Sequence, residues 1–134
     1  MSRSGYSEDI DQWDLIRWRG AVTSALRGAR GQALLRDMLA ALDSLSGKRL
    51  IAGELEEAGE VCALGAVGRL RGVDMRDIDP EDYEQVAPAF NVADALAREV
   101  MFQNDEAFSH ETPEQRWSRM RAWVVSQILP GTTS

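Results

Sequence analysis

Residues 48–72, "KRLIAGELEEAGEVCALGAVGRLRG", decide the fold, because they read either as helix or as a β-hairpin. The segment "RLIAGEL" at 49–55 is apolar but too short for periodicity to separate a strand from a helix. From residue 60 to Gly72, apolar residues recur at helical spacing: Val61, Leu64, Val67 and Leu70. We therefore expect helix in this stretch, with a two-stranded hairpin over 49–64 as the alternative.

Cys62, the only cysteine, lies inside this stretch among small residues. A catalytic thiol needs a base and a neighbourhood that lowers its pKa. The sole histidine, His110, is 48 positions away, and no signature links the two. The glycines do not match a phosphate-binding loop either. Gly65 and Gly68 lie near one helical face, so we expect a buried, structural cysteine at the close approach of a neighbouring helix.

Apolar stripes and capping signals predict further helices on both sides of this stretch. Asp11 is the expected cap of a helix whose inner face carries Leu15, Trp18, Val22 and Ala25. A second helix over 32–45 follows after the short link "RGARG", which favours an antiparallel helical hairpin. Later helices are expected to start at Asp79-Pro80, at Asn91 and, through a Thr112–Gln115 capping box, at Pro113.

Length and composition indicate one all-α domain of five to six helices. We expect a flexible N-terminal arm at 1–8, a single helical domain at 9–129 and a frayed tail at 130–134. No apolar run reaches the roughly 20 residues of a membrane span, and the acidic N-terminus is not a signal peptide. A single cysteine agrees with a reducing compartment, so the expected location is the cytoplasm of a bacterial host.

The net charge of −7 is unevenly distributed. Residues 52–114 hold 4 basic and 16 acidic side chains, a net charge of −12. Such a segment repels nucleic-acid phosphates and attracts basic partners, so we expect no direct contact with nucleic acid. The alternative is a solvated face that only aids solubility. The candidate acidic patch comprises Glu54, Glu56, Glu57, Glu60, Asp74, Asp77, Asp79, Glu81 and Asp82.

The same residues provide no recognisable metal or catalytic site. Asp77, Asp79 and Glu81 have the spacing of a calcium loop, but Asp82 replaces the required glycine and Pro88 the bidentate glutamate. One cysteine and one histidine are too few for a zinc site. We expect no catalytic residue, metal or cofactor.

Four tryptophans occupy the two terminal helices. Trp18 and Trp117 lie on the apolar stripes and are expected in the core. Trp13 and Trp123 lie off the stripes, and together with Arg17 and Arg119 they form a second candidate partner surface, since Trp and Arg are enriched at binding hot spots. The alternative is that they cover the rim of the core.

Three short motifs carry a resemblance to a known group. They are Cys62–Ala66 (CALGA), Asn104-Asp105 and Thr112–Arg116 (TPEQR). With them the chain resembles small uncharacterised acidic helical proteins encoded by bacterial phages, prophages and mobile elements. The resemblance covers about half of the chain and implies a genomic setting rather than an activity.

Together these observations favour a non-enzymatic binding protein of a mobile element. Its expected partner is a host protein or complex with a basic surface, and one concrete form is an anti-CRISPR-like or DNA-mimic inhibitor of a nucleic-acid-binding defence complex. The first alternative is a structural or regulatory accessory protein that acts as a homodimer through Trp13, Trp123 and the glycine face. The second is a small carboxylate-dependent hydrolase.

Overall fold

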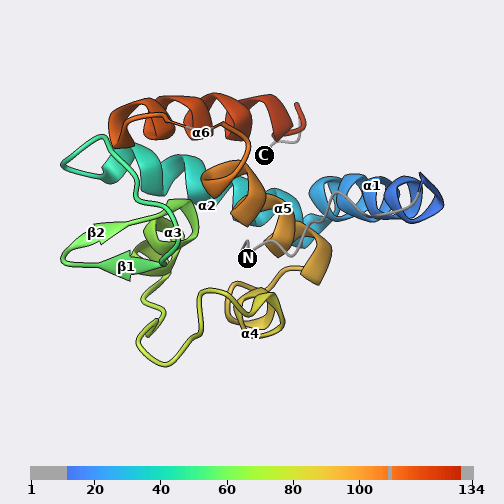
Figure 1. The fold of residues 1–134 in the computed structure, drawn as a ribbon, viewed down its shortest axis with the longest axis horizontal. Coiled ribbons are helices and arrows are strands. Elements are labelled where there is room, and N and C mark those ends of the chain that lie inside the picture. The colour runs from blue at the N-terminus through green and yellow to red at the C-terminus, as the bar shows by residue number, and fades with distance from the viewer. Residues whose placement is uncertain (1–11, 109, 131–134) are drawn as a thin grey trace.

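The structure is a computed structural model and describes residues 12–108 and 110–130. The arm predicted at 1–8, the cap predicted at Asp11 and residues 131–134 of the predicted tail lie outside the described residues. In the described ranges the chain forms six helices and one two-stranded hairpin (Figure 1): α1 (Gln12–Arg27), α2 (Ala29–Ser44), β1 (Glu56–Glu57), β2 (Glu60–Val61), α3 (Ala63–Arg71), α4 (Tyr83–Ala89), α5 (Asp94–Asp105) and α6 (Pro113–Gln127). The predicted all-α class is confirmed.

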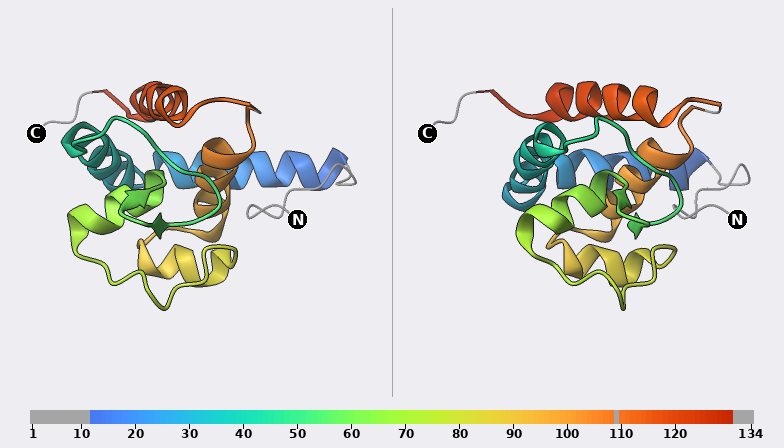
Figure 2. Two further views of the ribbon diagram at one scale, coloured as in Figure 1. Left: turned by 60° about the vertical axis from the view of Figure 1, so that its left-hand side comes forward. Right: turned by 90° about the vertical axis from the view of Figure 1, so that its left-hand side faces the viewer.

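The centre of the fold is α2, which packs against both α3 and α6. In Figures 1 and 2 α6 lies along the top of the molecule over α2, and α3 lies below it. The helix expected over 32–45 buries an apolar stripe where these helices meet, at Leu35, Met38 and Leu42. Full burial of each such side chain contributes about 1.5–3 kcal/mol, which explains why α2 organises the core.

Residues 48–72 form a β-hairpin that is followed by a helix. Strands β1 and β2 pair antiparallel, and the two turn residues between them, Ala58 and Gly59, both have positive φ (52° and 84°). Helix α3 begins only at Ala63, where Cys62 is the N-cap. Our expectation of helix from Glu60 is therefore wrong, and the hairpin alternative within 49–64 is confirmed over 56–61.

The two glycines of α3 allow close approach to loops, not to a neighbouring helix as expected, although α3 as a whole packs against α2. A Cβ added at Gly65 would lie 1.8 Å from the carbonyl oxygen of Leu55. At Gly68 it would lie 2.4 Å from the sulfur of Met75. The segments before and after the hairpin–helix unit therefore fold directly onto α3. Cys62 is buried at this position, with 1% of its surface exposed.

Two predicted helix starts are shifted toward the C-terminus. Helix α4 begins at Tyr83 with Asp82 as its cap, so Asp79-Pro80 belongs to a preceding turn. Helix α5 begins at Asp94 after Ala93, and Asn91 is not its cap but lies in the link with φ 57°. The later elements follow the prediction. Thr112 and Gln115 form the capping box of α6, and Val92, Leu96 and Val100 are buried.

Helix α1 differs most from the prediction. It does not fold back on α2; Figure 1 shows the two helices following the same general direction, joined at Gly28, with the first turns of α1 extending away from the body. Within the predicted inner face only Val22 is buried, and Leu15 remains 42% exposed. The spacing of apolar residues identifies the face of a helix that points inward, but it does not show how much of the helix length packs against another element.

Candidate functional site

Two of the nine acidic residues predicted as a patch line a shallow hollow, and the others lie in the two chain segments that border it. Glu54 and Glu56 line one wall, from the segment that enters the hairpin, and the chain after α3 forms the other wall. The hollow has a volume of about 210 Å³, and its lining is completed by Leu55, Met75, Arg76, Ile78 and Pro80. Two acidic segments separated by α3 in sequence therefore lie side by side, at the lower left of Figure 1.

Three of the nine acids are neutralised by arginines of the same face. Glu60 forms a two-pronged ion pair with Arg49, with N–O distances of 2.8 and 2.9 Å. Glu56 accepts from Arg69 at 3.2 Å. Asp74 pairs with Arg76, whose hydrogen bonds lower the pKa of Asp74 to about 2. These pairs are exposed, so each adds little stability but reduces the local negative charge.

Two more acids cap backbone N–H groups. Asp79 accepts a hydrogen bond from the N–H of Glu81 at 2.9 Å, which closes the turn at Pro80. Asp82 accepts from the N–H of Glu84 at 3.0 Å and thereby starts α4. Their carboxylates hold the loop and the helix in place, as carboxylates commonly do at helix starts.

The remaining four acids are exposed and make no ion pair or side-chain hydrogen bond within the described residues. They are Glu54, Glu57, Asp77 and Glu81. Of these four, only Glu54 lines the hollow, where its carboxylate together with Leu55, Met75 and Ile78 can accept a lysine or arginine side chain. The aliphatic stem would cover the apolar side chains, and the charged head would reach the carboxylate.

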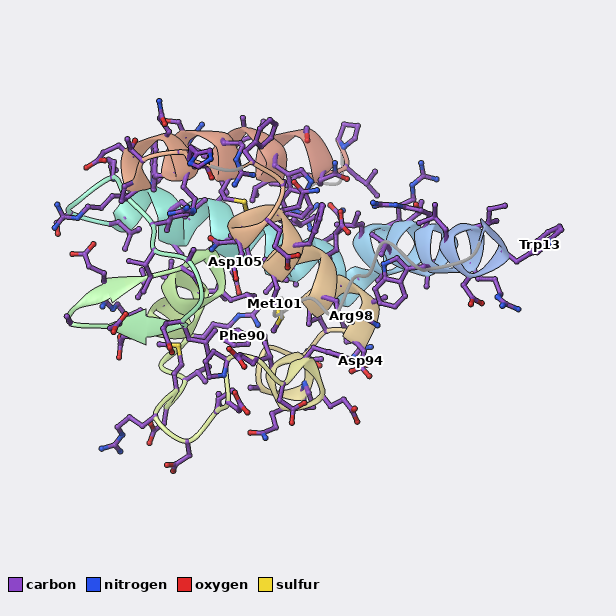
Figure 3. The ribbon with its side chains drawn as sticks, viewed as in Figure 1. Trp13, Phe90, Asp94, Arg98, Met101 and Asp105 are labelled. Carbon is purple, nitrogen blue, oxygen red and sulfur yellow. The ribbon has the colours of Figure 1, made fainter. Side chains whose placement is uncertain are left out.

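The fold does not bring together the four residues of the second candidate surface, the two tryptophans and two arginines of α1 and α6. Trp13 extends from the tip of α1 with 73% of its surface exposed (Figure 3), and Arg17 lies one turn further along that helix. Trp123 belongs to α6, where it is half-buried against the core. Arg119, also in α6, is held by Glu111 in a two-pronged ion pair with distances of 2.6 and 2.9 Å. The other two tryptophans, Trp18 and Trp117, are also half-buried; Trp18 stacks against Arg98 and Trp117 packs on the core.

A buried polar junction joins the three motifs that carry the resemblance. The Oδ1 atom of Asn104 accepts the N–H of Ala63 at 3.1 Å. The guanidinium of Arg116 donates to the backbone oxygens of Asn104 and Leu50, both at 3.0 Å. Arg116 also lies 3.4 Å from Glu111, whose pKa is lowered chiefly by its hydrogen bonds to Arg119. Sequence reasoning missed this junction, although the three motifs themselves were the available signal.

The polar side chains of this junction hold the structure together. Its members are largely buried, and within the described residues no buried side-chain nitrogen or oxygen lacks a hydrogen-bond partner. Cys62 also has a structural role here, since its sulfur accepts the N–H of Gly65 at 3.4 Å. His110 is exposed in the loop before α6, with φ 62°.

No family model matches the chain, and neither the curated proteins nor the solved structures include a match. In the part of the chain that the structure describes, no group of three or more His, Cys, Asp or Glu side chains is arranged to hold a metal ion. No helix among the described residues has the length and apolarity needed to cross a membrane.

Proposed function

We propose that the protein is a non-enzymatic binding protein whose acidic face occupies a basic surface of a partner, such as the nucleic-acid-binding groove of a host defence complex. The observation that carries this proposal is the hollow between the hairpin and the 73–80 segment. It combines the apolar side chains of Leu55, Met75 and Ile78 with the unpaired carboxylate of Glu54. Glu57 and Asp77, also exposed and unpaired among the described residues, belong to the hairpin and to the 73–80 segment that flank it.

The ion pairs within the protein support this proposal, because they determine which carboxylates are paired with arginine and which remain unpaired. Arg69 and Arg49 hold Glu56 and Glu60 in fixed positions on the hairpin. Glu57, between them in sequence, extends from the hairpin next to the positive-φ turn without a partner of its own in the described residues. The acids that stay available to a partner are therefore the unpaired ones, and their charges complement cations on a basic surface.

A mobile-element origin, which the resemblance implies, makes a host defence complex the most informative class of partner to test. Such complexes hold nucleic acid in basic grooves. An acidic protein that fills the groove would displace the nucleic acid without any chemical step. No observation favours the hydrolase, so we do not propose it.

The test is competition for nucleic acid. A panel of purified bacterial nucleic-acid-binding complexes, RNA-guided nucleases included, is loaded with a fluorescent duplex, and displacement by the protein is measured at 50 and 200 mM salt. We expect displacement from at least one complex, with weaker displacement at higher salt. The Glu54→Gln/Glu57→Gln variant should lose about tenfold in affinity.

The matched control is Asp94→Asn/Glu114→Gln, which removes the same charge from exposed sites at the starts of α5 and α6. We expect this control to bind like the native protein. Equal losses in the two variants would show that net charge alone matters and would refute the acidic-face proposal. Absence of displacement across the panel at low salt would refute the choice of partner class.

A further inference from the structure

The first half of α1, which extends from the protein body, exposes three large apolar side chains among its charged ones. Trp13 is 73% exposed and Ile16 is 54% exposed. Leu15 is exposed as well, although it lies on the same side of the helix as Val22, which is buried further along. Large apolar side chains exposed together mark a surface that a partner can cover. Trp13 is the largest of these side chains and points away from the body at the tip of α1 (Figure 3).

The opposite end of α1 carries a hollow that could receive such a side chain. It has a volume of about 400 Å³ and lies where α1 meets α2. Its lining is almost entirely small residues with one cation: Ala21, Ser24, Gly28, Gly31, Ala93 and Arg30. Small side chains admit a ring close to the backbone, and a guanidinium can stack on its face.

The two features belong to one face of the helix. Trp13, Arg17, Ala21, Ser24 and Gly28 follow one another at steps of three or four residues, which places them along one side of α1. Trp13 cannot reach the hollow of its own chain, because 15 residues of helix separate the tryptophan from Gly28 by about 22 Å. A second copy running in the opposite direction brings each tryptophan to the hollow of the other.

We infer that the protein forms a two-fold symmetric dimer in which the α1 helices pack antiparallel and Trp13 of each copy enters the hollow beside Arg30 of the other. Such an interface is self-complementary, as a two-fold contact requires. Asp14, next to Trp13 and paired with Arg17 within the helix, then gains the Arg30 guanidinium of the second copy as a further partner. The opposed helix dipoles add to the attraction.

Charge sets the salt dependence of this contact. Residues 12–36 contain five arginines against the single acid Asp14, so the two copies bring net positive charge together. Salt screens that repulsion while it leaves the insertion of the indole unaffected. The dimer should therefore tighten with added salt, whereas binding through the acidic face weakens with it, and the two proposals can fail separately.

The first test is sedimentation equilibrium of the full chain over the micromolar range. We expect a monomer–dimer equilibrium that Trp13→Ala weakens about a hundredfold, since a hot-spot tryptophan is worth roughly tenfold or more and occurs twice. Ser24→Leu, which fills the hollow, should weaken it similarly. Ser118→Leu, the same change at an exposed site of α6, is the control and should dimerise normally. Unchanged helical circular dichroism checks that each variant folds.

The second test is a charge exchange. Asp14→Arg and Arg30→Asp should each dimerise weakly alone, because like charges then meet at both contacts. A mixture of the two variants should form mixed dimers at native affinity, since each contact again joins an arginine to an aspartate. Failure of the mixture to associate would overturn the antiparallel arrangement. A monomer at all concentrations would overturn the dimer. Loss of association on deleting residues 1–11, with native association of Trp13→Ala, would assign the contact to that segment instead.

Discussion

Asn104, at the end of α5, accepts a hydrogen bond from the backbone N–H of Ala63, the first residue of α3, at 3.1 Å. Its amide nitrogen donates to the carbonyl of Ile51 at 2.9 Å. One side chain, 1% exposed, therefore satisfies backbone groups on both sides of the hairpin. Together with Arg116, it joins segments that are 50 or more residues apart in sequence.

Asn104→Leu should destabilise the protein by about 2–5 kcal/mol, because a buried N–H and a buried carbonyl each lose their partner. The shape of the side chain is nearly kept, so little of this loss comes from a cavity. Urea unfolding followed by circular dichroism measures the change. Gln127→Leu, which removes a half-buried amide that donates only to the exposed Ser126 hydroxyl at 3.4 Å, should cost under about 1 kcal/mol and serves as the control. Equal costs at the two positions would show that the junction is unimportant.

Sequence patterns identified the elements whose signals are local. The Thr112–Gln115 capping box needs only four residues, and the stripe of α2 needs only one helix, so both are readable without tertiary information. The hairpin was not favoured because Ala58 occupies a positive-φ position that Asn, Asp or Gly normally fills. Because alanine has no preference for turns, its presence at position 58 does not indicate one.

The sequence does not show which group each acidic side chain pairs with. Asp79 and Asp82 both looked like acids at a helix start, yet only Asp82 caps α4, because the turn at Pro80 uses Asp79. The acidic candidates were all visible in the sequence. Which of them are free was not, since the choice depends on Arg49 and Arg69, which reach the hairpin from other segments. Long-range pairing of side chains leaves no periodic signal.

The Glu111 carboxylate should make the protein sensitive to acid. Arg119 lowers the pKa of Glu111 in the folded state, so the stabilisation is complete above the unfolded pKa of about 4.3 and is lost as pH falls through the lower folded value. Glu111→Gln should cost about 3–5 kcal/mol at pH 7, because two largely buried arginines lose their counter-ion. The difference between the two proteins should shrink in urea titrations at pH 3.

The exposed pair of Asp43 with Arg121 provides the comparison for Glu111. Arg121 also lowers the pKa of Asp43, but both side chains are solvated, so Asp43→Asn should destabilise the protein far less than Glu111→Gln does. If removing Asp43 costs as much as removing Glu111, burial is not what gives the junction its strength.

Gly65 and Gly68 should respond differently to alanine. The new methyl group at Gly65 would meet the carbonyl of Leu55, which is backbone and cannot move aside, so Gly65→Ala should cost about 3 kcal/mol or more. At Gly68 the obstacle is the flexible end of Met75, and alanine also gains about 1 kcal/mol of helix propensity. Gly68→Ala should therefore stay within about 1 kcal/mol of the native protein in urea unfolding. A reversed order would contradict the packing of α3.

Ala58→Asn should stabilise the hairpin by about 1 kcal/mol. Alanine at φ 52° is strained, and asparagine tolerates this conformation at the first position of a two-residue hairpin turn. The melting temperature should rise accordingly. The control is Ala52→Asn, an exposed alanine without positive φ, where we expect no gain. Destabilisation by asparagine at 58 would mean that the turn does not have the described geometry.

Cys62 should react with thiol reagents only when the native structure opens. Its sulfur is buried and accepts the N–H of Gly65, so a reagent reaches it only through unfolding of the α3 region. With the stability of an ordinary domain, labelling should be at least about a thousandfold slower in buffer than in concentrated urea, which provides the reference rate for the exposed thiol. Absorbance of the released chromophore follows both reactions. Rates within about tenfold of each other would show an accessible thiol, and a catalytic role for Cys62 would then have to be reconsidered.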